Sequence, residues 1–153
     1  MAAYFIDSSA LAKRYVTETD THWMQALTDP VSGNSLFVVR ITLVELVAAI
    51  SRRRKNGDLT PADAAAALSD VRADFASDYR VIEVRATHIA QAGALADRHA
   101  LRGDDAVQLA AAIHVNDAYA AAGQPAVTLI SADLELNAVA AAEGLGVDDP
   151  NTH

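Results

Sequence analysis

The sequence predicts an α/β fold, a three-layer α/β/α sandwich around a short parallel sheet of four or five strands. Short apolar runs typical of buried strands alternate along the chain with longer, alanine-rich stretches typical of helices. Strands that alternate with helices pair in parallel through right-handed crossovers, which places helices on both faces of the sheet. The 153 residues fit one domain, and no linker or low-complexity segment divides them.

Each expected strand is a short apolar run bounded by turn or polar residues. The first, Tyr4 to Ile6, ends at an acid, and the second, Leu36 to Val39, follows a turn-rich segment. Polar and apolar residues alternate from Arg80 to Val84, which predicts a third strand. A fourth strand is expected at Ala126 to Ile130 and a short edge strand at Leu145 to Val147.

The helices are predicted from start and stop signals and from composition. Thr60 and Pro61 are typical of a helix start, because Thr caps free N–H groups and Pro suits the first turn. Alanine, the best helix former, is abundant in the later segments. We expect helices at Ala10 to Val16, Asp20 to Leu27, Ile41 to Lys55, Pro61 to Ser77, Thr87 to Leu101, Asp105 to Ala122 and Asp133 to Glu143.

Charge is unevenly distributed along the chain. Lys and Arg number 12 and Asp and Glu number 20, and the net charge of −8 argues against a simple nucleic-acid binder. Residues 1–55 carry a balance of +2, whereas residues 103–153 contain eight acids and neither Lys nor Arg. That acidic third is either a solvated surface or a cluster of acids with a specific role. The absence of cysteine excludes disulfides, thiolate metal sites and cysteine nucleophiles.

Neither a membrane segment nor a secretion signal is expected. Every apolar run is shorter than the roughly 18 residues that a spanning helix needs. The first residues, MAAYFID, lack the basic region and apolar stretch of a secretory signal. We therefore expect a cytoplasmic protein without membrane contact.

Two acids follow expected buried strands. Asp7 comes directly after the first strand, and Asp133 comes shortly after the fourth. Ligands bind at the carboxyl ends of the strands in an open parallel sheet, so these acids converge if their strands are neighbours. Each of them is also a common helix N-cap residue, and capping is the alternative for either acid alone.

Two further acids lie in expected helices. Glu45 belongs to an apolar segment, and a buried carboxylate needs a partner such as a cation. Alternatively, Thr42 and Glu45 have the T-x-x-E spacing of a capping box, in which the Glu side chain reaches back to the helix start. Asp104 and Asp105 lie at the start of an expected helix, where negative side chains interact favourably with the helix dipole. We expect Asp105 to point inward and Asp104 to face solvent.

Taken together, these acids are the donor set of a hard cation. Carboxylate oxygens without cysteine or a histidine pair suit Mg²⁺, which binds through a few carboxylates together with substrate phosphates. Such an ion can activate a water and stabilise the attacking and leaving oxygens of a phosphodiester. The predicted ligands are Asp7, Glu45, Asp105 and Asp133.

Four segments, in this order and spacing, resemble the motifs of PIN domains, the ribonuclease fold of VapC-type toxins. In the third motif of that family the acid directly before Ala belongs to the metal site, which selects Asp105. Many relatives have an aromatic residue at the position of Asp104. The similar segments are Tyr4 to Lys13, Ile41 to Ala49, Leu101 to Ala110 and Leu129 to Leu136.

The resemblance implies one PIN-like domain over residues 1–153 and a metal-dependent endoribonuclease, the toxin of a toxin–antitoxin pair. It implies Mg²⁺ or Mn²⁺ as the cofactor, RNA as the substrate, a cognate antitoxin whose tail occupies the active-site groove, and a homodimer. A solitary PIN nuclease in RNA processing and a catalytically inactive domain that binds RNA or protein are the alternatives. A phosphatase-like hydrolase with Asp7 as nucleophile is disfavoured, because Ser9 stands where a second acid is needed.

Several other residues are candidates for supporting roles. Ser9 either orients Asp7 by a hydrogen bond or is a helix-start hydroxyl. Asn137, one helical turn after Asp133, either points to the same groove or is a surface amide. An acidic site would repel RNA, so nearby bases must contact phosphates. The candidate bases are Lys13, Arg14, Arg40, Arg52, Arg53, Arg54 and Lys55.

Overall fold

A computed structural model of the chain describes residues 1–17 and 21–153. Its centre is one five-stranded sheet with the order β3-β2-β1-β4-β5, in which every neighbouring pair is parallel. Strand order reverses beside β1, because β2 and β3 extend the sheet on one side and β4 and β5 on the other. The strands are β1 (Ala3–Ile6), β2 (Ser35–Val39), β3 (Arg80–Ile82), β4 (Thr128–Ile130) and β5 (Gly146–Asp148).

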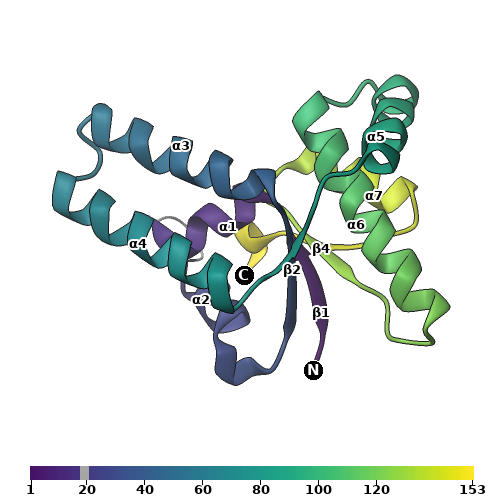
Figure 1. Cartoon of the computed structure of the whole chain (residues 1–153), viewed down its shortest axis with the longest axis horizontal. Helices are drawn as coiled ribbons and strands as arrows, with labels where there is room; N and C mark the ends of the chain where they lie inside the picture. Colours follow the sequence, from purple (N-terminus) through teal and green to yellow (C-terminus); the bar gives the residue numbers. More distant parts are fainter. Residues whose placement is uncertain (18–20) are drawn as a thin grey trace.

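Helices cover both faces of this sheet, which makes the predicted three-layer α/β/α sandwich (Figure 1). The helices α1 to α4 pack on one face and α5 to α7 on the other. Short 3₁₀ turns lie at Pro30–Ser32 and Pro150–Thr152. The helices are α1 (Ser8–Tyr15), α2 (Thr21–Thr28), α3 (Ile41–Lys55), α4 (Pro61–Ser77), α5 (Ala86–His99), α6 (Gly103–Ala121) and α7 (Leu134–Ala142).

Side-chain alternation along the strands divides the core between the two faces. Phe5 and Leu129 point toward α5, α6 and α7, whereas Ile6 and Ile130 point toward the α1 to α4 face. All four side chains are fully buried, as expected for strands covered on both sides. The pairing of Ile6 with Ile130 brings the carboxyl ends of β1 and β4 together. The strand-end acids therefore start from neighbouring positions.

Most elements were predicted, but several ends differ by one or two residues. The helix expected from Asp105 begins at Gly103, because Arg102 has the extended backbone of an N-cap residue. The helix expected to reach Leu101 stops at His99, because Ala100 adopts a left-handed conformation with φ of 53°. The helix expected from Asp20 begins at Thr21, and Asp20 lies outside the described residues. In the described part of the chain, no helix has the length and apolar character needed to cross a membrane.

Candidate active site

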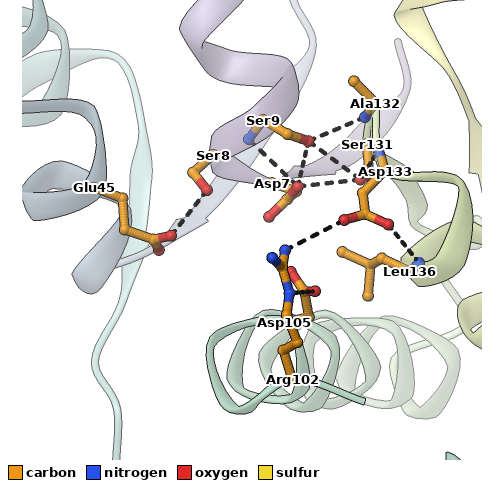
Figure 2. Close-up of polar contacts among 10 residues, drawn as sticks. All are labelled: Asp7, Ser8, Ser9, Glu45, Arg102, Asp105, Ser131, Ala132, Asp133 and Leu136. Carbon is orange, nitrogen blue, oxygen red and sulfur yellow. Dashed lines mark hydrogen bonds and ion pairs between the residues drawn. The ribbon is translucent and has the colours of Figure 1, made fainter. Parts of the chain in front are cut away.

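The four predicted site carboxylates line one pocket at the carboxyl ends of β1 and β4. The pocket has a volume of about 200 Å³ and lies where the strand order reverses, the usual position of a ligand site in an open α/β sheet. Figure 2 shows the acids approaching it from different elements. Its lining comprises Asp7, Ser8, Ser9, Ala12, Glu45, Leu46, Ala49, Arg52, Arg102, Asp105 and Asp133.

If the site were chosen by cavity volume alone, a different hollow would be the candidate. A larger hollow of about 630 Å³ lies beside β3 and the start of α5, next to His88 and His114. Its lining contains one acid, Glu83, which pairs with Arg40. The smaller pocket is the candidate site, because convergent charged groups identify a reactive site better than size does.

Asp7 is held by two serine hydroxyls that both donate to its Oδ2 atom. Ser9 Oγ lies 2.5 Å from Oδ2 and Ser131 Oγ lies 3.1 Å from it. The same two hydroxyls accept the backbone N–H groups of Ala132 and Asp133, each at 3.1 Å. Asp7 is thereby tied to the loop that carries Asp133, as the dashed lines in Figure 2 show. The predicted orienting role of Ser9 matches this geometry.

Asp7 also caps α1, so capping and a place in the pocket are compatible. Its side chain accepts the backbone N–H of Ser9 at 3.4 Å, while its other oxygen, Oδ1, turns away from both serines (Figure 2). The side chain is almost fully buried, and burial raises its pKa, an effect that the serine hydrogen bonds partly offset.

Glu45 is held by side chains from two other helices. Ser8 Oγ donates to Oε2 at 3.1 Å, and Gln108 Nε2 donates to Oε1 at 3.0 Å. The capping-box alternative is wrong, because Arg40 rather than Thr42 stands at the start of α3. The Thr42 hydroxyl instead accepts from Gln108 at 2.9 Å. Burial raises the pKa of Glu45, and the negative charges of nearby acids add to this effect.

Asp105 and Asp133 share a basic partner, Arg102. Arg102 Nε donates to Asp105 Oδ2 at 3.2 Å, and its Nη2 atom forms an ion pair with Asp133 Oδ2 at 3.5 Å. Asp105 is buried, and chiefly for that reason its pKa rises to about 6. Asp133 also caps α7, because its Oδ1 atom accepts the Leu136 N–H at 3.0 Å. As expected, Asp104 is exposed to solvent.

Apart from Ser9, sequence reasoning missed the residues that hold the acids in place. Arg102 precedes Asp105 by three residues, and Gln108 follows it by three, spacings that place all three side chains on neighbouring positions of α6. Ser131 lies between β4 and Asp133, so its position in the same loop was the available signal. Asn137 takes neither expected position, since its half-buried amide donates to the Ser131 carbonyl at 2.8 Å.

Among the candidate phosphate-binding bases, Arg52 reaches the pocket. Lys13 is buried, and Arg14 forms an ion pair with Asp74 at 3.7 Å. Arg40 pairs with Glu83 outside the pocket. The physical reason is helix geometry, because Ser8, Ser9 and Ala12 form the pocket face of α1 and the two following bases point to other sides.

The carboxylates of the pocket are suitable ligands for a divalent cation, although they are not close enough together in this structure to form a complete ligand set. Within residues 1–17 and 21–153, no three Asp, Glu, His or Cys side chains are grouped so as to hold one metal ion. Four carboxylates nevertheless line one pocket, and burial raises the pKa of Asp7, Glu45 and Asp105. Buried like charges are costly unless an opposite charge joins them, so this pocket favours a cation.

The fold is a parallel α/β sandwich, and four acids gather where its strand order reverses. These two features together indicate the class of protein. The PIN domain family model matches residues 4–142, and the chain therefore belongs to the PIN-domain family. It is similar to Ribonuclease VapC45 of Mycobacterium tuberculosis, with 38% identity over 117 residues that cover 76% of this chain and 79% of the relative.

Solved structures support the same fold. VapBC2 from Rickettsia felis, bound to a DNA fragment from its promoter, has a TM-score of 0.62 at 16% identity and covers 96% of this chain and 98% of that chain. VapC20 of Mycobacterium tuberculosis, a toxin that cleaves the sarcin–ricin loop, has a TM-score of 0.61 at 19% identity and covers 93% and 95%. At these identities the likeness concerns the fold.

Proposed function

We propose that this protein is a metal-dependent endoribonuclease that acts in the cytoplasm as the toxin of a toxin–antitoxin pair. The observation that carries the proposal is the convergence of Asp7, Glu45, Asp105 and Asp133 on one pocket. The similarity to a VapC ribonuclease at 38% identity supports RNA as the substrate. Residues 1–153 would work as one PIN-like domain, because the matched region spans nearly all of the elements of the sheet.

The four carboxylates would hold Mg²⁺ or Mn²⁺. A divalent cation in such a site supplies Lewis-acid chemistry, by activating a water and by offsetting negative charge on the phosphodiester. The protein's own contribution is to hold the acids in place before substrate arrives. Ser9 and Ser131 fix Asp7, while Ser8 and Gln108 fix Glu45, and these neutral donors leave the negative charge of both acids intact.

Arg52 would hold the RNA backbone beside the cleaved bond. It lies seven residues after Glu45, two turns along α3, so both side chains face the pocket. Ala12 and Ala49 line the pocket as well, and their small side chains leave room for a sugar–phosphate chain. Contact with phosphates rather than bases predicts salt-dependent binding with little sequence preference from this residue.

A second copy of the chain would cover an apolar surface formed by α3 and α5. Ile41, Val44 and Ile89 are 42%, 65% and 54% exposed, and they line a groove of about 460 Å³ between α3 and α5. Contiguous apolar surface of this kind is typical of protein interfaces. Arg40 and Glu83, which pair with each other, lie at the edge of this groove and leave its apolar centre uncharged. A cognate antitoxin would then block the site by placing a basic segment among the carboxylates.

The test is cleavage of a defined RNA by purified, metal-stripped protein with added Mg²⁺ or Mn²⁺ and with EDTA. Cleavage should require the added ion and should be lost in Asp105→Asn, because that carboxylate lies inside the pocket. The matched control is Asp104→Asn, which makes the same chemical change at the neighbouring exposed position. Full cleavage in EDTA, or by the Asp105 variant, would contradict the proposal.

The biological role needs a separate experiment. Expression of the wild-type chain should arrest growth, and co-expression of the adjacent reading frame that encodes its antitoxin should restore it. Growth arrest that no neighbouring gene relieves would favour a solitary nuclease. Light scattering of the purified protein tests the homodimer, with Ile89→Glu expected to shift it to a monomer because a charge would enter the apolar surface.

A further inference from the structure

Arg102 occupies the position in the pocket that a shared cation would need. Its guanidinium lies between Asp105 and Asp133, with Nε 3.2 Å from one Oδ2 atom and Nη2 3.5 Å from the other. Figure 2 shows it reaching up from the start of α6 to bridge the two acids. An ion bound by the same two oxygens could not share them with the guanidinium, because two cations at contact distance repel each other.

The surroundings of Arg102 allow it to leave. The side chain is 68% exposed, and although Arg102 is the N-cap residue of α6, its side chain makes no capping hydrogen bond. Because water screens the exposed guanidinium, its ion pairs with the less exposed Asp105 and Asp133 are weakened. The chain after Arg102 contains no Lys or Arg, so the segment that carries Asp105 and Asp133 has no base of its own to offset them. Arg102 therefore stands at the boundary of the acid-only third of the sequence.

We propose that Arg102 is an exchangeable counter-ion, which neutralises Asp105 and Asp133 until a divalent cation displaces it and then contacts the RNA phosphate. This inference rests on the proposed metal-dependent cleavage of RNA. Displacement turns the guanidinium toward the mouth of the pocket, where its planar fork of donors suits a phosphate. The residue is thus a competitor of the metal in one state and a substrate-binding residue in the other.

A comparison with Arg52 shows why the role of exchangeable counter-ion is assigned to Arg102. It lines the same pocket, but in the described part of the chain it forms no ion pair with the four site acids. Removal of Arg52 should weaken RNA binding without changing the affinity for metal. Removal of Arg102 should change both quantities, and in opposite directions, which a merely structural role would not do.

The experiment measures Mn²⁺ binding to metal-stripped protein by isothermal titration calorimetry. Arg102→Gln should bind Mn²⁺ about three- to tenfold more tightly than wild type, the expected effect of removing an exposed guanidinium from two ion pairs. Arg102→Lys, which keeps the charge but loses the fork, should lie between the two. Arg98→Gln is the matched control, because this base of α5 is also exposed and paired, with Glu143, outside the pocket. Its Mn²⁺ affinity should equal that of wild type.

The second measurement is the apparent RNA affinity in single-turnover cleavage at saturating Mn²⁺. Arg102→Gln should bind RNA more weakly, and the slope of log affinity against log salt should become shallower by about one. Unchanged or weaker Mn²⁺ binding would overturn the competition, and unchanged RNA affinity and salt slope would overturn the phosphate contact. If wild type itself binds no Mn²⁺, the proposed metal site is wrong as well, so the two failures are distinguishable.

Discussion

The two halves of the carboxylate pocket are held in different ways. Asp7 follows β1 and Glu45 lies in α3. Both carboxylates receive hydrogen bonds from neutral hydroxyl or amide groups. Asp105 and Asp133, which lie at the starts of α6 and α7, share the charged guanidinium of Arg102. Neutral donors fix a carboxylate without cancelling its charge, whereas a guanidinium cancels it. In the proposed metal complex, the first half would therefore accept a cation directly, whereas the second would exchange the guanidinium for it.

Two of the neutral partners also differ from Arg102 in burial. The hydroxyl of Ser131 and the amide of Gln108 are completely buried, so they cannot leave the acids that they contact. Arg102 is largely exposed and can move into solvent at little cost. Under the proposal, the half held by neutral donors would fix where an ion sits, and the half held by Arg102 would control how easily it enters. Each of the following substitutions tests this division.

Asp7→Asn should have the largest effect. The amide keeps the size of the side chain and can still accept from Ser9, but it removes the negative charge of the most buried acid in the pocket. RNA cleavage should fall by more than about 100-fold, beyond the loss expected for a residue that only supports a ligand. Rate measurements at saturating metal test this expectation, with far-UV circular dichroism as the folding control. A variant with more than a tenth of wild-type activity would show that Asp7 is not essential.

Gln108→Leu should have the next largest effect, because it leaves one buried and one half-buried acceptor without their donor. Its amide bonds both Glu45 Oε1 and Thr42 Oγ1, at 3.0 and 2.9 Å. Cleavage should fall by about 10-fold to 100-fold through misplacement of Glu45. The free energy of unfolding should fall by about 1–3 kcal/mol. Urea unfolding measures the second quantity, and a fully stable variant would contradict the importance of the buried amide.

Ser9→Ala and Ser131→Ala should have smaller, coupled effects. Both hydroxyls donate to the same atom, Asp7 Oδ2, and one can partly replace the other. Each single substitution should reduce cleavage by about tenfold or less, and the double variant should lose more than the product of the two. A double-mutant cycle on cleavage rates measures this coupling. Strictly multiplicative losses would mean that the serines do not act on Asp7 together.

These differences also explain how much of the site could be predicted from the sequence. The positions of Asp7 and Asp133 follow from strand order, because acids after β1 and β4 meet once the two strands pair. The inward direction of Asp105 could be predicted from the family motif and is seen in the structure. The same reasoning could not find Gln108 or Ser131, since their roles depend on how α6 packs beside the strand ends.

The predicted roles of the bases depended most on tertiary structure. Lys13 and Arg14 are close to Asp7 in sequence, yet the helical turn directs them away from the pocket, so one is buried and the other meets Asp74. The role of Arg102 could not be predicted from the sequence, because only one of its two partners, Asp105, lies nearby along the chain. Its contact with Asp133 joins segments that are far apart along the chain and exists only after folding.

Asp104→Asn should have the smallest effect and is the most stringent test of the division. Asp104 is adjacent to Asp105 and adds to the local negative charge, but its side chain faces solvent, where water and salt screen it. Metal affinity and cleavage should stay within about twofold of wild type at physiological salt, because exposed charges interact weakly. A larger loss, comparable to that of Asp105→Asn, would mean that Asp104 turns into the pocket when the ion binds. In that case the half held by Arg102 would include three carboxylates, and the displacement of Arg102 would be only part of the rearrangement.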